Sequence, residues 1–109
     1  MVERRQFVRY SAFMDVLYKP ASTHAPIFRC RSRDVSQGGL RLYGDQDIGM
    51  GQMLELELKI PGDSSPVSAV GKVVWSKKTR AYCYEAGIQF EGITMYDRNR
   101  LVSYGMTAA

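Results

Sequence analysis

The sequence predicts an all-β fold, a six-stranded antiparallel β-barrel with one short helix at its C-terminal end. Three observations predict it. Apolar and polar residues alternate with a period of two along most of the chain, which is typical of strands with one buried face. Turn-forming sequences, such as Ser36–Gly39 and Pro61–Asp63, separate the alternating segments. The period becomes helical only near the C-terminal end.

The six expected strands differ in how clearly the alternation marks their faces. The segment 54–60 is the clearest, because Leu or Ile occupies every second position. The segment 28–33 has one fully basic face, which we expect to be solvated. Trp75 is in phase with Val73, so we expect it to pack in the core. The strands are expected at residues 12–19, 28–33, 39–43, 54–60, 67–75 and 82–90.

The two ends of the chain lack strand patterns. Thr94 precedes Asp97 by three positions, as in a capping box, and predicts a helix over 94–104 that closes one mouth of the barrel. Residues 1–10 predict a flexible arm. With a barrel over 11–92, the 109 residues then form a single domain.

Composition excludes several classes of protein. The chain is 45% hydrophobic and 24% charged, which is ordinary for a globular domain and excludes a mainly disordered chain. Its apolar runs are too short for a membrane span. The charged start has no apolar segment typical of a secretory signal, and two cysteines are too few for a disulfide-rich scaffold. We therefore expect a cytoplasmic protein.

The residues give little support for catalysis or metal binding. His24 is the only histidine, and it lies in a predicted loop, so a catalytic triad has no basis. Cys30 and Cys83 do not have the spacing of a zinc site. Asp45 and Asp47 lack the pattern of a calcium loop. We expect a protein that is not an enzyme and needs no metal or cofactor.

The positive charge gathers in the first part of the chain. The whole chain carries +4, but residues 1–41 hold eight basic and three acidic side chains, a net charge of +5. Seven of those eight are arginines, whose planar guanidinium groups suit bidentate acceptors such as phosphate or a guanine edge. This half of the chain is therefore suited to bind an anion or a nucleotide. The basic residues are Arg4, Arg5, Arg9, Lys19, Arg29, Arg31, Arg33 and Arg41.

Two motifs lie in this basic half. Arg5 and Arg9 form an R-x-x-x-R pair at the end of the arm, a pattern that occurs about once by chance in a chain of this composition. Asp34-Val35-Ser36-Gln37-Gly38-Gly39 forms a D-x-S-x-x-G turn between the second and third strands. The chance expectation for that string is about 0.05 matches, so the turn motif carries information.

In this order and strand context, the motifs resemble the PilZ domain, the bacterial receptor module for cyclic di-GMP. Gly71-Lys72-Val73-Val74-Trp75 is similar to a G-x-V-x-W strand of that family, and Gly87–Phe90 to its last strand. The Tyr96-Asp97-Arg98 segment resembles the helix that follows. The resemblance covers nearly the whole chain. It implies a PilZ-type barrel that binds the dinucleotide on its outside, across the arm and the turn.

The residue types suit that ligand. A guanidinium fork matches the N7 and O6 acceptors of guanine, so Arg5 and Arg9 are candidates for a base edge and a phosphate. The Asp34 carboxylate can accept from guanine N1–H and the exocyclic amine. The alternative is a solvated basic arm.

The turn has its own candidates for contact with the ligand. Ser36 offers a small hydroxyl, and Gly39, with Gly38 beside it, permits positive φ and close approach of a ligand. The alternative is that Asp34 and Ser36 are turn formers that bond the local backbone.

Arg4 adds a third arginine to the arm. Within the family, the resemblance implies that an arginine at this position accompanies an intercalated dimer of cyclic di-GMP, whereas a bulky apolar residue accompanies one ligand. We therefore expect two ligand molecules per chain.

The function expected from the resemblance is a cyclic di-GMP receptor. On binding, the arm would change conformation and present a new surface to an unidentified downstream protein. Two alternatives stay open: a small β-barrel that binds nucleic acid, and a PilZ-fold interaction module without ligand. The predicted exposed strand faces carry no run of stacking aromatic residues, which disfavours nucleic acid.

Overall fold

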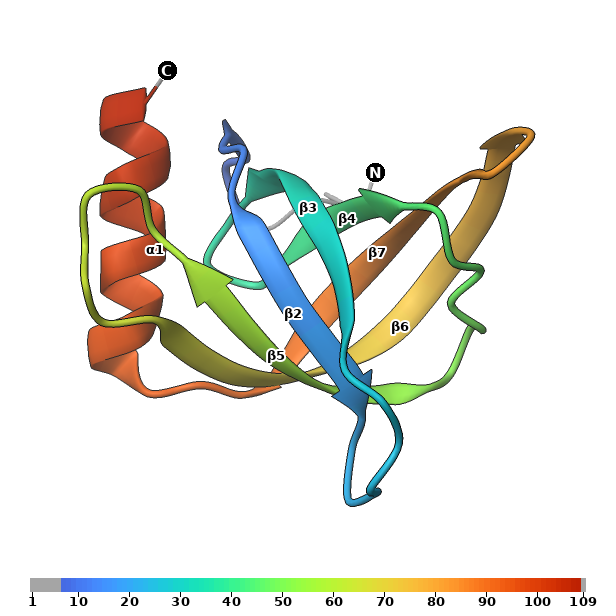
Figure 1. Ribbon diagram of the computed structural model, residues 1–109. Helices are drawn as coiled ribbons and strands as arrows, with labels where there is room; N and C mark the ends of the chain where they lie inside the picture. Colours follow the sequence, from blue (N-terminus) through green and yellow to red (C-terminus); the bar gives the residue numbers. More distant parts are fainter. Residues whose placement is uncertain (1–6, 109) are drawn as a thin grey trace, which may run out of the picture.

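The computed structural model describes residues 7–108, which form strands followed by one helix (Figure 1). Four of the seven strands alternate between buried and more exposed positions over at least half of their length, as the sequence pattern predicts. The elements are β1 (Tyr10–Ser11), β2 (Asp15–Pro20), β3 (Phe28–Val35), β4 (Gly39–Gly44), β5 (Met53–Lys59), β6 (Val67–Arg80), β7 (Cys83–Gly92) and α1 (Met95–Ala108).

Six of these strands close into an antiparallel barrel, which confirms the predicted fold class. The hydrogen-bonded order is β3-β2-β5-β6-β7-β4, and β4 pairs with β3 to complete the ring. The two-residue strand β1 is additional and pairs with the end of β3, where Tyr10 lies opposite Val35. Tyr10 was predicted to belong to the arm and the first strand to begin at residue 12, so strand pairing begins two residues earlier than expected. Closure leaves the barrel itself without a free edge.

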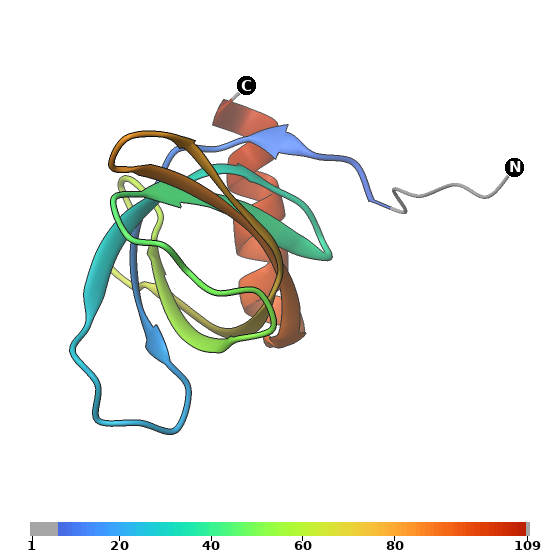
Figure 2. The same cartoon turned by 90° about the vertical axis from the view of Figure 1, so that its right-hand side faces the viewer.

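The core fills the inside of the barrel. Leu54, Leu56 and Leu58 of β5 are at most 4% exposed, as their alternation predicts. Figure 2 looks into the barrel, with α1 standing behind the far opening. Leu101 of α1 is completely buried in the same core, so the helix covers one end of the barrel, as expected.

The helix begins where the sequence predicts. The Thr94 hydroxyl accepts a hydrogen bond from the Asp97 amide at 3.1 Å, which satisfies a backbone donor of the first turn. The helix continues to Ala108, beyond the predicted end at residue 104. Gly105 lets α1 approach β1 closely, since a Cβ atom there would lie 2.7 Å from Cβ of Tyr10.

Candidate functional site

A hollow on the outside of the barrel surrounds the Ser36–Gly39 turn, and we call it the turn hollow. Its volume is about 580 Å³, within the range of small-molecule sites. Its walls come from the segment before β1, the β3–β4 turn, the middle of β6, the end of β7, and α1. The residues that line it are Phe7, Arg9, Asp34, Ser36, Gln37, Gly38, Gly39, Leu40, Val74, Trp75, Gly87, Ile88, Gln89, Phe90 and Arg98.

A β-bulge brings Asp34 to this outer face. Ser32 pairs with Leu42, whereas Asp34 pairs with Arg41, so Arg33 is an extra residue in the ladder between β3 and β4. An extra residue reverses the phase of the side chains that follow it. Asp34 therefore lies on the outer face with Arg41 and not in the core.

Asp34 is the centre of a chain of charged groups. Its Oδ2 lies 2.8 Å from Nη2 of Arg41, and its Oδ1 lies 3.8 Å from Nη1 of Arg9. Arg41 also approaches Glu85, with 3.6 Å between Nη1 and Oε1. Asp34 is only 8% exposed, and a carboxylate so buried needs such partners. The distances leave Oδ1 as the less engaged oxygen.

Ser36 bonds the local backbone, as the turn-former alternative predicts. Its Oγ accepts from the Gly38 amide at 3.2 Å and lies 3.4 Å from the Gly39 carbonyl oxygen. The Ser36 amide donates to that same carbonyl oxygen at 2.9 Å. The long second contact is a weak hydrogen bond, so the hydroxyl proton has no strong acceptor within the turn.

The two turn glycines are needed for close packing, and neither of them uses the positive φ that glycine permits. Among the described residues, positive-φ glycines occur only at Gly51 and Gly62. A Cβ atom at Gly39 would lie 1.9 Å from the Ile88 carbonyl oxygen of β7. At Gly38 it would lie 2.8 Å from Cδ2 of the Phe7 ring. Small size, rather than backbone conformation, is what these positions require.

Trp75 lines the turn hollow, so the expectation that it packs in the core is wrong. Val73 pairs with Ile88 and Trp75 pairs with Gly87, which leaves Val74 as the extra residue of a second bulge. The bulge turns the indole outward. A Cβ atom at Gly87 would lie 2.1 Å from Nε1 of Trp75, so the half-buried ring lies directly on the glycine of β7.

The fold brings together five of the seven residues predicted from the motifs. Arg9, Asp34, Ser36, Gly38 and Gly39 all line the turn hollow. Arg4 and Arg5 lie outside the described residues, so their part in the site stays a prediction.

Sequence reasoning missed several residues of the site. Phe7, Arg41, Trp75 and Arg98 were not predicted to belong to it. The alternation along β4 could have placed Arg41 on the outer face. No feature of the sequence predicts the two β-bulges at Arg33 and Val74.

The basic face of β3 is separate from this hollow. Arg29, Arg31 and Arg33 are all exposed, as expected of a solvated strand face. Arg31 lies 3.8 Å from Asp15, and the Arg33 guanidinium lies 5.1 Å from the centre of the Tyr43 ring. None of the three lines the turn hollow.

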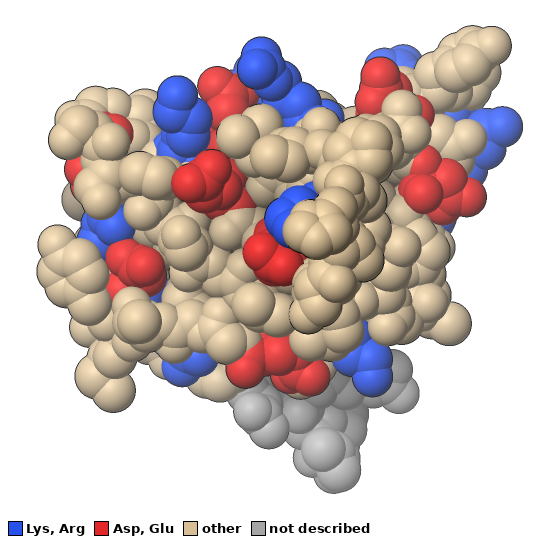
Figure 3. All heavy atoms as spheres, turned by 60° about the horizontal axis from the view of Figure 1, so that its bottom comes forward, with Lys and Arg blue, Asp and Glu red and all other residues tan. Residues whose placement is uncertain are grey.

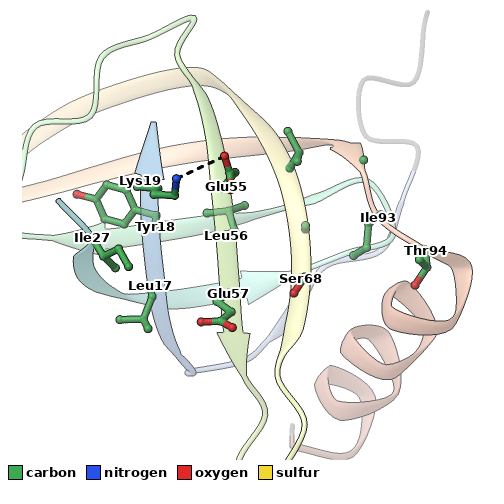
Figure 4. A pocket seen from close by; sticks show the side chains of 13 residues that line it. Leu17, Tyr18, Lys19, Ile27, Glu55, Leu56, Glu57, Ser68, Ile93 and Thr94 are labelled. Atoms are coloured by element: carbon green, nitrogen blue, oxygen red, sulfur yellow. Dashed lines mark ion pairs between the residues drawn. The ribbon is translucent and has the colours of Figure 1, made fainter. Parts of the chain in front are cut away.

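A second hollow lies across β2, β5 and the start of β6, and we call it the β2–β5 groove (Figure 4). Its volume is about 550 Å³. Leu17, Ile27 and Ile93 contribute apolar surface. Its one lysine, Lys19, lies 3.7 Å from Glu55, and the pair is drawn in Figure 4. Among the residues that the structure describes, the lining therefore offers no unpaired cation to an anionic ligand.

The face that comes forward in Figure 3 carries basic and acidic side chains interspersed with large uncharged areas. A continuous basic stripe, which nucleic-acid binding along that face would need, is not seen there. Across residues 7–108, no helix combines the length and apolar character that a bilayer crossing requires.

The comparisons with known proteins agree with this architecture. The PilZ domain model matches residues 3–105, and the chain therefore belongs to the PilZ domain family. The resemblance seen in the sequence is confirmed. Among curated protein sequences, none matches this chain.

Solved structures show the same fold. The chain is similar to the inhibitor of motility MotI/DgrA from Bacillus subtilis, with a TM-score of 0.77 and 21% identity over 98% of this chain and 52% of that one. It is similar to the PilZ domain of YcgR from Escherichia coli, with a TM-score of 0.73, 15% identity and coverage of 96% and 91%. For K. pneumonia MrkH the TM-score is 0.70, with 14% identity and coverage of 98% and 52%. The chain thus spans about half the length of MotI and MrkH.

Proposed function

We propose that this chain is a receptor for cyclic di-GMP that binds its ligand in the turn hollow. The observation that carries the proposal is the set of groups in that hollow: arginine, a buried carboxylate and an aromatic face around a narrow turn. The YcgR and MrkH structures that the chain resembles contain c-di-GMP. Membership of the PilZ family supports the same ligand.

Each group has a chemical role toward a guanine dinucleotide. The Arg9 guanidinium, only loosely paired with Asp34 at 3.8 Å, is available to a phosphate oxygen or to N7 and O6 of guanine. The less engaged Oδ1 of Asp34 accepts from guanine N1–H and the exocyclic amine. Arg41 holds the other oxygen at 2.8 Å and so fixes the orientation of the carboxylate. The Ser36 hydroxyl proton reaches phosphate.

Binding would then be signalled through the arm, which contains Arg5 and Arg9. We propose that the arm changes conformation when its arginines contact the ligand, and that the changed surface is read by a separate protein. Hydrogen exchange of residues 1–10 with and without saturating cyclic di-GMP tests this. Identical exchange profiles would overturn it.

Arg4 extends the proposal to stoichiometry. A third arginine beside the R-x-x-x-R pair could stack on a guanine of a second ligand molecule, which gives an intercalated dimer and two ligands per chain. Titration calorimetry measures the ratio directly. We expect a ratio near two for the native chain and near one for Arg4→Leu, and a ratio of one for both would contradict the proposal.

One titration tests the receptor function itself. We expect cyclic di-GMP to bind more tightly than single-stranded DNA, as measured by calorimetry at one ionic strength. Tighter binding of single-stranded DNA would favour the nucleic-acid alternative. Binding of neither would favour an interaction module without ligand.

A further inference from the structure

Arg98 is a cation of the turn hollow that belongs to neither the R-x-x-x-R pair nor the D-x-S-x-x-G turn. It lies on the first turn of α1 and lines the hollow together with the residues of the turn motif. Its Nε atom is buried and has no hydrogen-bond partner. Within residues 7–108 no carboxylate oxygen lies within 4.0 Å of its guanidinium, whereas Arg9 and Arg41 both approach Asp34.

Arg100 lies two residues further along α1 and does have carboxylate partners. The lack of such a partner among residues 7–108 therefore depends on the position of Arg98. Arg100 pairs with Asp97 at 2.9 Å and with Asp63 at 2.8 Å, on a different side of the helix. Those two carboxylates raise the pKa of Arg100, with the hydrogen bond to Asp63 as the largest cause. Arg100 is therefore an internal structural contact, whereas no carboxylate among residues 7–108 compensates the charge of Arg98.

A buried donor without an acceptor is unfavourable, and an uncompensated positive charge beside a hollow attracts an anion. Among residues 7–108 the one carboxylate that lines the hollow is Asp34, and Arg41 already holds it at 2.8 Å. An anion bound in the hollow therefore meets Arg98 without competition from a carboxylate of the described chain.

The backbone that carries Arg98 is fixed at both ends of its segment. Thr94 caps the helix at 3.1 Å, and Leu101, three residues after Arg98, is fully buried in the barrel core. A side chain on such a rigid element is well placed for binding, because little conformational freedom is lost when the ligand arrives.

We propose that Arg98 binds a phosphodiester group of the ligand and thereby makes α1 part of the binding site. The inference rests on the proposed function, since cyclic di-GMP supplies the phosphodiester. The ligand would then be held between the segment that carries Arg9 and the helix that closes the barrel.

The test compares calorimetric binding of cyclic di-GMP by the native chain, Arg98→Gln, Arg98→Lys and Arg100→Gln. We expect Arg98→Gln to weaken binding by at least about tenfold and Arg98→Lys to recover part of the loss, because it keeps the charge. Arg100→Gln should bind within about twofold of the native chain, although its loss of two ion pairs lowers the melting temperature. Thermal unfolding of every variant reports whether the fold is retained, and Arg98→Lys serves if Arg98→Gln does not fold.

Salt dependence distinguishes a phosphate contact from a contact with a base. Removing a cation–phosphate pair should weaken the dependence of affinity on ionic strength. An unchanged salt dependence in Arg98→Gln would overturn the assignment to phosphate. Native affinity in Arg98→Gln would overturn the role of Arg98 but leave the receptor function standing. No binding by the native chain would refute the receptor function, and the assignment of Arg98 with it.

Discussion

The turn hollow and the β2–β5 groove are nearly equal in volume but differ in how their charges are paired. The turn hollow measures about 580 Å³ and the β2–β5 groove about 550 Å³. In the groove the single lysine faces a glutamate, and most of the remaining surface is apolar. In the turn hollow, the described lining has two arginines, Arg9 and Arg98, and one carboxylate, Asp34, which Arg41 already holds. Size therefore does not distinguish the proposed ligand site from the groove, whereas the excess of cations does.

The largest effect that we expect is on ligand affinity. It is tested by removing the cation of the ion pair in each hollow. Arg9 lies 3.8 Å from Asp34 in the turn hollow, and Lys19 lies 3.7 Å from Glu55 in the groove. We expect Arg9→Ala to weaken cyclic di-GMP binding by about 2–3 kcal/mol, or tens- to hundreds-fold, because a charge-assisted contact is lost. Lys19→Ala should leave affinity unchanged in the same calorimetric titration. Equal effects from the two variants would place the ligand elsewhere.

The next largest effect that we expect is on folding stability, and two glycines of β7 test it. A Cβ atom at Gly87 would lie 2.1 Å from the Trp75 indole, whereas one at Gly92, in the groove, would lie 3.6 Å from Cβ of Val70. We expect Gly87→Ala to cost about 1–3 kcal/mol of folding stability by overpacking. Gly92→Ala should cost clearly less, because 3.6 Å is ordinary contact. Chemical denaturation measures both, and a larger loss for Gly92→Ala would contradict the described packing of Trp75.

The smallest effect that we expect is a loss of folding stability at alkaline pH. It involves Tyr18, which lines the β2–β5 groove. Burial is the main cause that raises the pKa of Tyr18 from 10.0 to about 12 and the pKa of the Cys30 thiol from 9.0 to about 12. Both groups stay protonated in the folded chain while the unfolded chain loses the protons. Their contribution to stability is therefore complete below about pH 9 and is lost as the pH rises toward 12.

Stability measured by denaturation between pH 8 and 11 checks this linkage. The decline should be shallower in Tyr18→Phe and in Cys30→Ala than in the native chain, because each variant removes one of the two titrating groups. A decline of the same steepness in all three proteins would show that other groups cause it.

The alternation of residues predicts the faces of the barrel wherever the strands pair regularly. Along β5 each Leu faces inward and the intervening Glu side chains face outward, since nothing shifts the phase. The same logic gives Cys30 and Ser32 inward positions on β3, and both are buried. The period of the hydrophobic residues and the composition of the turns were enough to predict the order of the six barrel strands along the chain and the C-terminal helix.

The candidate site was less predictable because two bulges determine it. Asp34 and Trp75 each follow one extra residue in a ladder, and a change of phase by one residue is invisible in the alternation. The turn motif identified Asp34 through its residue types alone. Trp75 belongs to the segment that resembles the G-x-V-x-W strand, but that resemblance does not say which face the ring occupies, and the alternation placed it on the wrong face. Arg98 could not be found from the sequence, because its approach to the hollow depends on how α1 closes the barrel.

The position of Trp75 also makes the chain its own optical reporter. It is the only tryptophan of the 109 residues, and its ring lies half-buried on Gly87 at the wall of the turn hollow. Indole emission responds to solvent and to stacked rings, so occupation of this hollow alters the fluorescence of the native chain without any attached dye. The β2–β5 groove has no tryptophan in its lining. A change in emission on adding a nucleotide thus reports on one hollow and not on the other.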